Sequence, residues 1–193
     1  MCPAALDANS YSIAQLACDL KKICALAADE REILNRVRPL ARRAAQAKDA
    51  WLDARMYEAD VEQGFGVHLL HEEPDHTLAI FAVSWLPNRG TPPHDHGTWV
   101  VVAGVDGPET NQFFERVDDQ SRPGYAELRK IGEKIFDFGE IIAMPTGGIH
   151  AVWNETDKVT LSLHIYGKHL NFTGRSKFDL ETKTETPFIL KMA

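Results

Sequence analysis

Residues 139–154 read GEIIAMPTGGIHAVWN, in which two apolar runs flank Pro145 and the Thr-Gly-Gly step at 146–148. Proline and glycine this close together are typical of a tight turn between two strands. The turn leads directly into a second strand that begins near His150. We therefore expect a tight β-turn that brings the His150 imidazole to the mouth of an enclosed β-structure.

The same pattern of short apolar segments and turns extends from about Val67 almost to the end of the chain. Short β-rich runs alternate with turns, and the runs read VHLLHE, TLAIFAVSW, TWVVVAGV, TNQFFERV, EIIAMP, HAVWN, VTLSLHIYG and FILK. The turns include Pro-Asn-Arg-Gly at 87–90, Asp-Gly-Pro at 106–108 and Arg-Pro-Gly at 122–124. At least eight strands at this spacing predict a mainly β fold, an antiparallel barrel of the jelly-roll type.

Residues 10–60 have a helical pattern instead. Apolar residues recur at the spacing of one buried helix face from Ile13 to Cys24. Asp29 followed by Glu32 predicts a capping box at the start of a second helix, which Pro39 is expected to kink or end. A third short helix is expected around 50–57. At 193 residues the chain is expected to form one domain, with these helices packed on a barrel formed by residues 65–190.

Composition excludes several classes of protein. The chain is 44% hydrophobic and 25% charged, which excludes a mainly disordered protein, and its net charge of −7 argues against nucleic acid as a partner. No apolar run is long enough for a membrane span, and the first residues lack a secretory pattern. The three cysteines, Cys2, Cys18 and Cys24, suggest no disulfide framework. A cytoplasmic protein without a membrane partner is expected.

Two further histidines stand close together in His94-Asp95-His96. Side chains in an extended segment alternate between faces, so both imidazoles lie on the same side and can hold one metal ion. Such a pair on its own is weak evidence, because two surface histidines would give the same pattern.

The motif around His150 resembles the second signature of the cupin superfamily. The pattern G-x5-P-x-G-x2-H-x3-N is matched at every position from Gly139 to Asn154. The segment around His94 resembles the first signature with two departures: Gly90 lies too close to His94, and Val100 replaces the metal-binding glutamate. The resemblance implies a cupin-type double-stranded β-helix with a metal on His94, His96 and His150.

The missing glutamate has a chemical consequence. Three neutral imidazoles leave a divalent metal with its full charge and about three open coordination positions. Such a site attracts an anionic ligand and suits Fe(II), although zinc, nickel, manganese or copper could also occupy it.

A polar row stands out in the run VTLSLHIYG. Ser162, His164 and Tyr166 alternate, so they share one face of the strand, opposite Leu161, Leu163 and Ile165. Because the apolar face requires a core, the polar face is expected to line a ligand-filled lumen and to form a hydrogen-bond relay. A solvent-exposed edge strand would be the alternative. The row is not a nucleophilic triad, because no carboxylate is placed to orient the imidazole.

Together, the HxH pair, the late histidine and the S-x-H-x-Y row resemble the thiol dioxygenases, the family of cysteine dioxygenase and 3-mercaptopropionate dioxygenase. The resemblance implies one Fe(II) per chain on the three histidines. It also implies an outer relay of Ser162, His164 and Tyr166, with the tyrosine beside the metal. The implied reaction adds both atoms of O2 to the sulfur of a small thiol and gives a sulfinate.

Two departures from the family bear on the substrate. Residues 97–101 contain no cysteine, so the crosslink to tyrosine found in the mammalian enzymes cannot form there. The family's carboxylate-binding arginine corresponds here to His68, so His68, or Arg89 or Arg175 from loops, is expected to bind the substrate. A substrate without a carboxylate, such as cysteamine, is equally compatible with this change.

Two other functions remain open. The chain could be another metal-dependent cupin enzyme that acts on a carbon substrate, although such enzymes more often keep the glutamate that Val100 replaces. It could also be a non-enzymatic cupin that binds a metal or small ligand. The row of Ser162, His164 and Tyr166 favours an enzyme, because a binding protein needs no proton relay.

Overall fold

The computed structural model describes residues 10–192. Its two long helices are α1 (Ile13–Leu26) and α2 (Glu30–Gln46), and three 3-10 helices follow, η1 (Lys48–Ala50), η2 (Ala54–Tyr57) and η3 (Leu170–Phe172). The prediction of one helix around 50–57 is wrong. Asp53 is extended and its side chain caps Arg55, so a new short turn begins where the helix was expected to continue.

Side chains cap both long helices at their first turns. Ser12 and Gln15 form a capping box at the start of α1. Asp29 accepts a hydrogen bond from the Glu32 N–H at 2.8 Å and caps α2. The expected capping box is only half formed, because the Glu32 side chain accepts from the Ala28 N–H and not from that of Asp29. Pro39 lies inside α2 and does not end it.

Eleven strands follow in the described part of the chain. The first six are β1 (Phe65–Glu72), β2 (Thr77–Trp85), β3 (Arg89–His94), β4 (Val100–Asp106), β5 (Glu109–Arg116) and β6 (Leu128–Phe136). The others are β7 (Ile141–Met144), β8 (Ile149–Asn154), β9 (Thr160–Lys168), β10 (Ser176–Asp179) and β11 (Thr184–Pro187). The final apolar run, FILK, is not a strand, because the Asn171 side chain bonds the backbone of Leu190 and holds this segment over the barrel.

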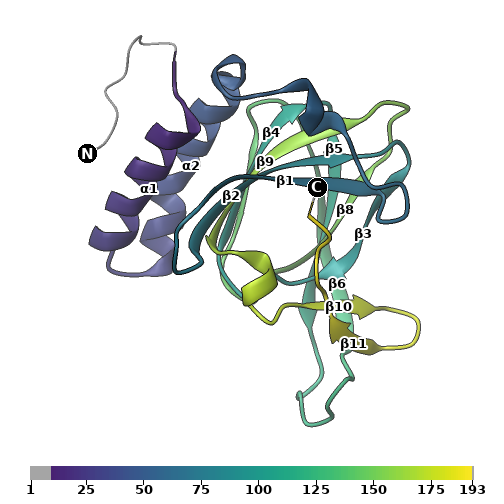
Figure 1. Ribbon diagram of the computed structural model, residues 1–193. Coiled ribbons are helices and arrows are strands. Elements are labelled where there is room, and N and C mark those ends of the chain that lie inside the picture. Colours follow the sequence, from purple (N-terminus) through teal and green to yellow (C-terminus); the bar gives the residue numbers. More distant parts are fainter. Residues whose placement is uncertain (1–9, 193) are drawn as a thin grey trace.

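The strand order is that of a jelly roll. One antiparallel sheet has the order β1-β2-β9-β4-β7, and the other has the order β11-β10-β3-β8-β5-β6. Within these sheets β2 pairs with β9, β3 with β8, β4 with β7 and β5 with β6, which is the nested pairing of an eight-strand double Greek key. Figure 1 shows the two sheets facing each other with both helices on one side. The predicted fold class is confirmed.

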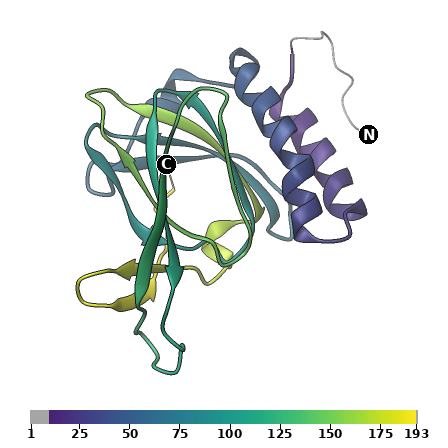
Figure 2. The same cartoon turned by 180° about the vertical axis from the view of Figure 1, so that it is seen from behind.

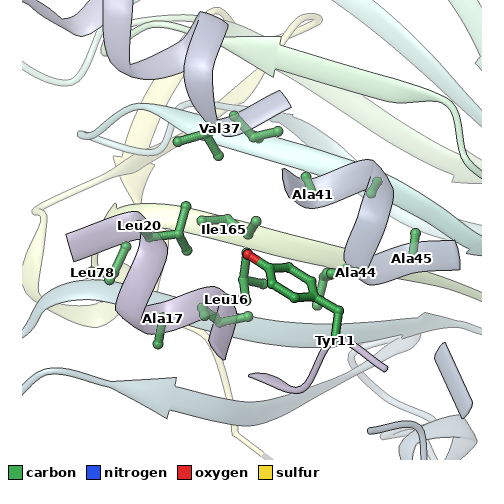
Figure 3. Packing of buried hydrophobic residues seen from close by; sticks show 14 of the residues in the cluster. Tyr11, Leu16, Ala17, Leu20, Val37, Ala41, Ala44, Ala45, Leu78 and Ile165 are labelled. Atoms are coloured by element: carbon green, nitrogen blue, oxygen red, sulfur yellow. The ribbon is translucent and has the colours of Figure 1, made fainter. Parts of the chain in front are cut away.

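The two helices cover the outer face of the first sheet. Leu161, Leu163 and Ile165 of β9 are fully buried there against Leu16 and Leu20 of α1 and the alanines of α2, as Figure 3 shows for part of this cluster. Burying a leucine side chain stabilises the fold by about 2 kcal/mol. Since this face of β9 is buried under the helices, its opposite face must point into the barrel.

A second contact holds the C-terminal hairpin. The hairpin of β10 and β11 lies beside the long β5–β6 hairpin at one end of the barrel, as both views show (Figures 1 and 2), and Tyr125 bridges to Thr184. Arg116 of β5 forms an ion pair with Glu185 at 2.8 Å. These contacts hold β11, and Glu185 also accepts a hydrogen bond at 2.9 Å from Ser176 Oγ at the start of β10, directly after Arg175.

The cysteines differ from expectation in one respect. Cys24 carries a free thiol on the exposed side of α1. Cys18 is disulfide-bonded, so the expectation from cysteine spacing is wrong for this residue. Cys2 lies outside the described residues. None of the described helices combines the length and the apolar character needed to span a membrane.

Candidate metal centre

The structure brings the three predicted histidines together inside the barrel. His94 ends β3, His96 follows two residues later, and His150 lies directly opposite His94 in β8. One ring nitrogen from each lies within 4.8 Å of the other two. The ring centroids are 4.6 to 5.0 Å apart, and all three side chains are buried. This separation allows three nitrogens to share one cation.

Hydrogen bonds orient two of the three rings. The Nδ1–H of His94 donates to the Pro92 carbonyl at 2.9 Å, and the Nδ1–H of His150 donates to the side-chain oxygen of Asn111 at 2.8 Å. Each bond fixes the tautomer and leaves Nε2 with its lone pair, the form that binds a metal. Asn111 was not predicted, because a lone asparagine in a strand gives no signal of its partner.

The third ring carries a buried nitrogen without a partner. Nδ1 of His96 is shielded from solvent and bonds to no described residue. Buried polar atoms are normally paired, so an unpaired one beside two oriented imidazoles is an observation in favour of a bound ion.

Burial also keeps the ligands uncharged. Desolvation lowers the pKa of His150 to about 3 and holds the pKa values of His94 and His96 well below their ordinary range. The neutral imidazole is the form that coordinates a metal. The residues present therefore fit a divalent cation.

No carboxylate of the described residues belongs to this cluster. Val100 is fully buried on β4, where it pairs with Tyr166 of β9. An apolar side chain thus occupies the position at which the cupin signature has a glutamate, and a bound metal would keep its full charge.

The polar row of β9 lines the interior, as its alternation predicted. Ser162 Oγ lies 2.9 Å from Nε2 of His164, and Nδ1 of the same ring lies 2.8 Å from the Tyr166 hydroxyl. The Tyr166 and His96 ring centroids are 5.3 Å apart. The hydrogen-bonded row therefore ends beside the histidine cluster.

Burial shapes the charge of this row as well. It lowers the pKa of His164 to about 3 and raises the pKa of Tyr166. Both rings are therefore neutral at physiological pH, and one proton forms the hydrogen bond between His164 Nδ1 and the Tyr166 hydroxyl.

The row continues to a residue that the sequence did not indicate. Glu109, the first residue of β5, is 1% exposed, and its Oε2 lies 3.1 Å from Ser162 Oγ. The indole N–H of Trp85 donates to the same hydroxyl at 3.3 Å. A glutamate directly after the Asp-Gly-Pro turn resembles a solvent-exposed residue, so only the register of β5 could have shown that it points inward.

Of the three predicted substrate-binding residues, Arg175 lies at the site. Its side chain is buried and lines an interior cavity together with His94, His150 and Tyr166. The guanidinium lies 4.3 Å from the ring centre of Phe188, and its Nε has no hydrogen-bond partner among residues 10–192. The Asp95 carboxylate attracts it without forming a close ion pair. Burial lowers the pKa of Arg175 to about 10, so the side chain remains a cation at neutral pH.

The other two residues do not reach the cavity. Val67 of β1 points inward, so its neighbour His68 points to the other face, where its Nε2 bonds the Glu58 carbonyl at 2.9 Å. Arg89 donates to the Glu62 carbonyl at 2.9 Å, outside the barrel interior. Of the three residues expected to bind the substrate, only Arg175 therefore lines the cavity.

A second, larger hollow lies between α1 and the turn that joins β1 to β2. It is lined by Lys21, Cys24 and Glu73, among others, and Lys21 and Glu73 form an ion pair across it at 2.8 Å. No member of the histidine cluster or of the polar row lines this hollow. The chemistry of the chain is therefore assigned to the interior cavity.

Comparison with known proteins does not assign the chain to a family. No family model matches it, and no curated protein is detectably similar. Among solved structures, an oxalate oxidase is similar over 64% of this chain and 61% of its own, with 16% identity and a TM-score of 0.47. The protein TT1209 of Thermus thermophilus is similar over 59% of this chain and 91% of its own, with 16% identity and a TM-score of 0.45.

A cupin domain of Schizosaccharomyces pombe Cnp3 is similar at a comparable level. The match covers 55% of this chain and 63% of that domain, with 9% identity and a TM-score of 0.44. At these identities the likeness concerns the arrangement of strands. The assignment of chemistry rests on the residues inside the barrel.

Proposed function

We propose that the protein is a non-haem iron dioxygenase that oxidises the sulfur of a small thiol to a sulfinate. The observation that carries the proposal is the meeting of three groups in one interior cavity. These are the three-histidine cluster, the tyrosine at the end of a hydrogen-bonded row and an unpaired arginine. In balanced form, R–S⁻ and O2 give R–SO2⁻, with both oxygen atoms added to sulfur.

The three histidines hold the metal. Fe(II), when bound, supplies a Lewis-acidic, redox-active centre that favours the thiolate over the thiol and accepts a second ligand. No carboxylate among residues 10–192 belongs to the histidine cluster, and the buried Val100 stands where a glutamate could have been. The site therefore favours a substrate that brings negative charge with it.

Arg175 supports a substrate with a second negative charge. A buried cation without an ionic partner is costly, and an anionic ligand would offset that cost. Its guanidinium is suited to bind a carboxylate through two parallel hydrogen bonds. A small mercaptocarboxylate, such as cysteine or 3-mercaptopropionate, complements the metal and the arginine together.

The simplest test is metal content and oxygen uptake. We expect purified protein to contain about one iron per chain, one metal for the single histidine cluster. With cysteine, 3-mercaptopropionate, cysteamine or mercaptosuccinate, oxygen consumption should match sulfinate formation mole for mole. Stoichiometric zinc, with no oxygen uptake after iron reconstitution, would count against the proposal.

Tyr166 is expected to take part in turnover without holding the metal. Tyr166→Phe removes only the hydroxyl that bonds His164, so the iron content should stay unchanged. Loss of one hydrogen bond to the reacting groups should slow kcat about tenfold. Iron analysis and single-turnover kinetics measure both effects, and an unchanged rate would remove the hydroxyl from the mechanism.

A further inference from the structure

Glu109 is a buried carboxyl group that the proposed mechanism does not use. Its Oε2 bonds Ser162 Oγ, and Ser162 bonds His164, which bonds Tyr166. A continuous chain of hydrogen bonds therefore joins the cavity to a carboxyl group on a different strand. The other oxygen, Oε1, has no partner among residues 10–192.

Each hydrogen bond of this chain can be formed in two opposite directions. With Glu109 ionised, Ser162 donates to the carboxylate, Nε2–H of His164 donates to Ser162, and Tyr166 donates to Nδ1. With Glu109 protonated, every bond reverses. Glu109 then donates to Ser162, Ser162 donates to Nε2, Nδ1–H donates to the Tyr166 oxygen, and the phenol proton points into the cavity.

Trp85 is compatible with both directions. Its indole N–H can only donate, and Ser162 Oγ can accept that bond at 3.3 Å while it donates to either neighbour. The hydrogen-bond chain therefore has two states, and its direction depends on whether Glu109 carries a proton.

Within residues 10–192, no opposing charge acts on Glu109. The groups that face it are the Ser162 hydroxyl of β9 and the Trp85 indole of β2, and its partner across β6 is Phe136. The ionisable group next along the chain is His164, which burial keeps neutral. Desolvation raises the pKa of Glu109 to about 8, so both of its charge states are accessible near neutral pH.

We infer that Glu109 is a positioning residue that sets the direction of this hydrogen-bond chain, and thereby whether Tyr166 offers the cavity a donor or an acceptor. Moving each proton by one place converts one state into the other. A proton taken up by Tyr166 from the cavity moves the tyrosine proton to Nδ1, the Nε2 proton to Ser162 and the serine proton to Glu109.

This transfer supplies a destination for the substrate proton, a consequence that rests on the proposed function. A thiol that binds as a thiolate releases one proton inside the barrel. In balanced form, R–SH and ionised Glu109 give R–S⁻ and protonated Glu109. The phenol of Tyr166 is then left as a hydrogen-bond donor toward the bound reactants.

The test reads the tautomer of His164 and requires no turnover. Protein with 15N-labelled histidine is loaded with zinc, which is diamagnetic, and ring-nitrogen NMR spectra are recorded from pH 6 to 10, with the His164 signals assigned from His164→Gln. We expect the Nδ1–H form at low pH and the Nε2–H form at high pH, with a midpoint near pH 8. In Glu109→Gln this transition should be lost, because the amide carries no titrating proton.

A matched control and a second variant keep the result decisive. Glu155 is an exposed glutamate that accepts a hydrogen bond from Thr110, the residue after Glu109 on β5. Glu155→Gln should therefore retain the transition. Ser162→Ala cuts the chain between Glu109 and the ring and should abolish it even if Glu109→Gln folds poorly. One fixed tautomer in wild type, or an unchanged transition in both Glu109→Gln and Ser162→Ala, would overturn the inference.

Activity supplies a second, separate readout. If the protein oxidises thiols, kcat/KM of the wild type should change with pH near pH 8, where Glu109 ionises. In Glu109→Gln this pH dependence should disappear while the iron content stays unchanged. If no thiol is oxidised but the tautomer transition follows Glu109, the proposed function fails while the inference about the chain stands.

Discussion

His150→Ala should abolish stoichiometric metal binding, and with it all oxygen uptake, in a protein that still folds. The reason is that His150 supplies one of three nitrogens, and the described cluster contains no carboxylate that could replace it. Loss of a partner outside the ligand set typically lowers metal affinity about 10- to 100-fold. Loss of one of three metal ligands should lower the metal affinity by more than this factor.

Two variants make this result interpretable. His71→Ala removes a histidine that bonds Glu73 on the outside of the barrel, and it should retain full metal content. Asn111→Leu removes only the acceptor that orients His150, so it should weaken metal binding about tenfold and leave some turnover. Metal analysis after dialysis against a chelator ranks the three proteins, and circular dichroism checks their fold. Full metal content in His150→Ala would remove this histidine from the site.

The inner and outer faces of β9 could be predicted from the sequence because they depend only on alternation. Leu161 and Ser162 are neighbours, and a strand sends neighbours to opposite faces. The cluster of His94 and His150 was predicted for a different reason. The two histidines lie on distant strands, and only the resemblance of their motifs to the two cupin signatures indicated that they meet.

Features that depend on pairing between distant strands were not predictable. β3 contains Pro92 and Pro93, which lack an N–H and argue against a strand, yet a register shift at this point lets the segment pair with β8. β6 is an exposed edge strand with polar residues on both faces, so it gives no alternating pattern. Glu109 became part of the site only through the register of β5, which brings it to Ser162.

The choice of His68 shows how sensitive a prediction of cavity-lining residues is to strand register. A position counted along β1 selected His68, but a shift of one residue moves a side chain to the other face, and Val67 lines the cavity instead. Arg175 reaches the site because Asp95, the middle residue of the HxH pair, accepts a hydrogen bond from the Ser176 N–H at 2.8 Å. The motif that provides two metal ligands thus also holds the adjacent arginine in place.

Arg175→Met should then lower kcat/KM for 3-mercaptopropionate about 100-fold, mainly through KM. Hydrogen bonds to charged groups contribute about 1.5–3 kcal/mol, and each 1.4 kcal/mol corresponds to a factor of about ten. If the guanidinium binds the carboxylate equally in the ground and transition states, kcat at saturation should change little. Methionine keeps the length and apolar packing of the side chain against Phe188 and removes a buried charge.

Comparison of two thiols separates the carboxylate contact from general damage to the site. Cysteamine lacks a carboxylate, and its ammonium group is repelled by the guanidinium, so its kcat/KM should stay unchanged or rise in Arg175→Met. Arg89→Met, which replaces an arginine bonded to the Glu62 carbonyl away from the cavity, should leave both thiols unaffected. Steady-state oxygen uptake with both thiols measures these ratios. An equal loss for the two thiols would show that Arg175 shapes the cavity without recognising a carboxylate, because only a direct charge contact can make the loss depend on the substrate's own charge.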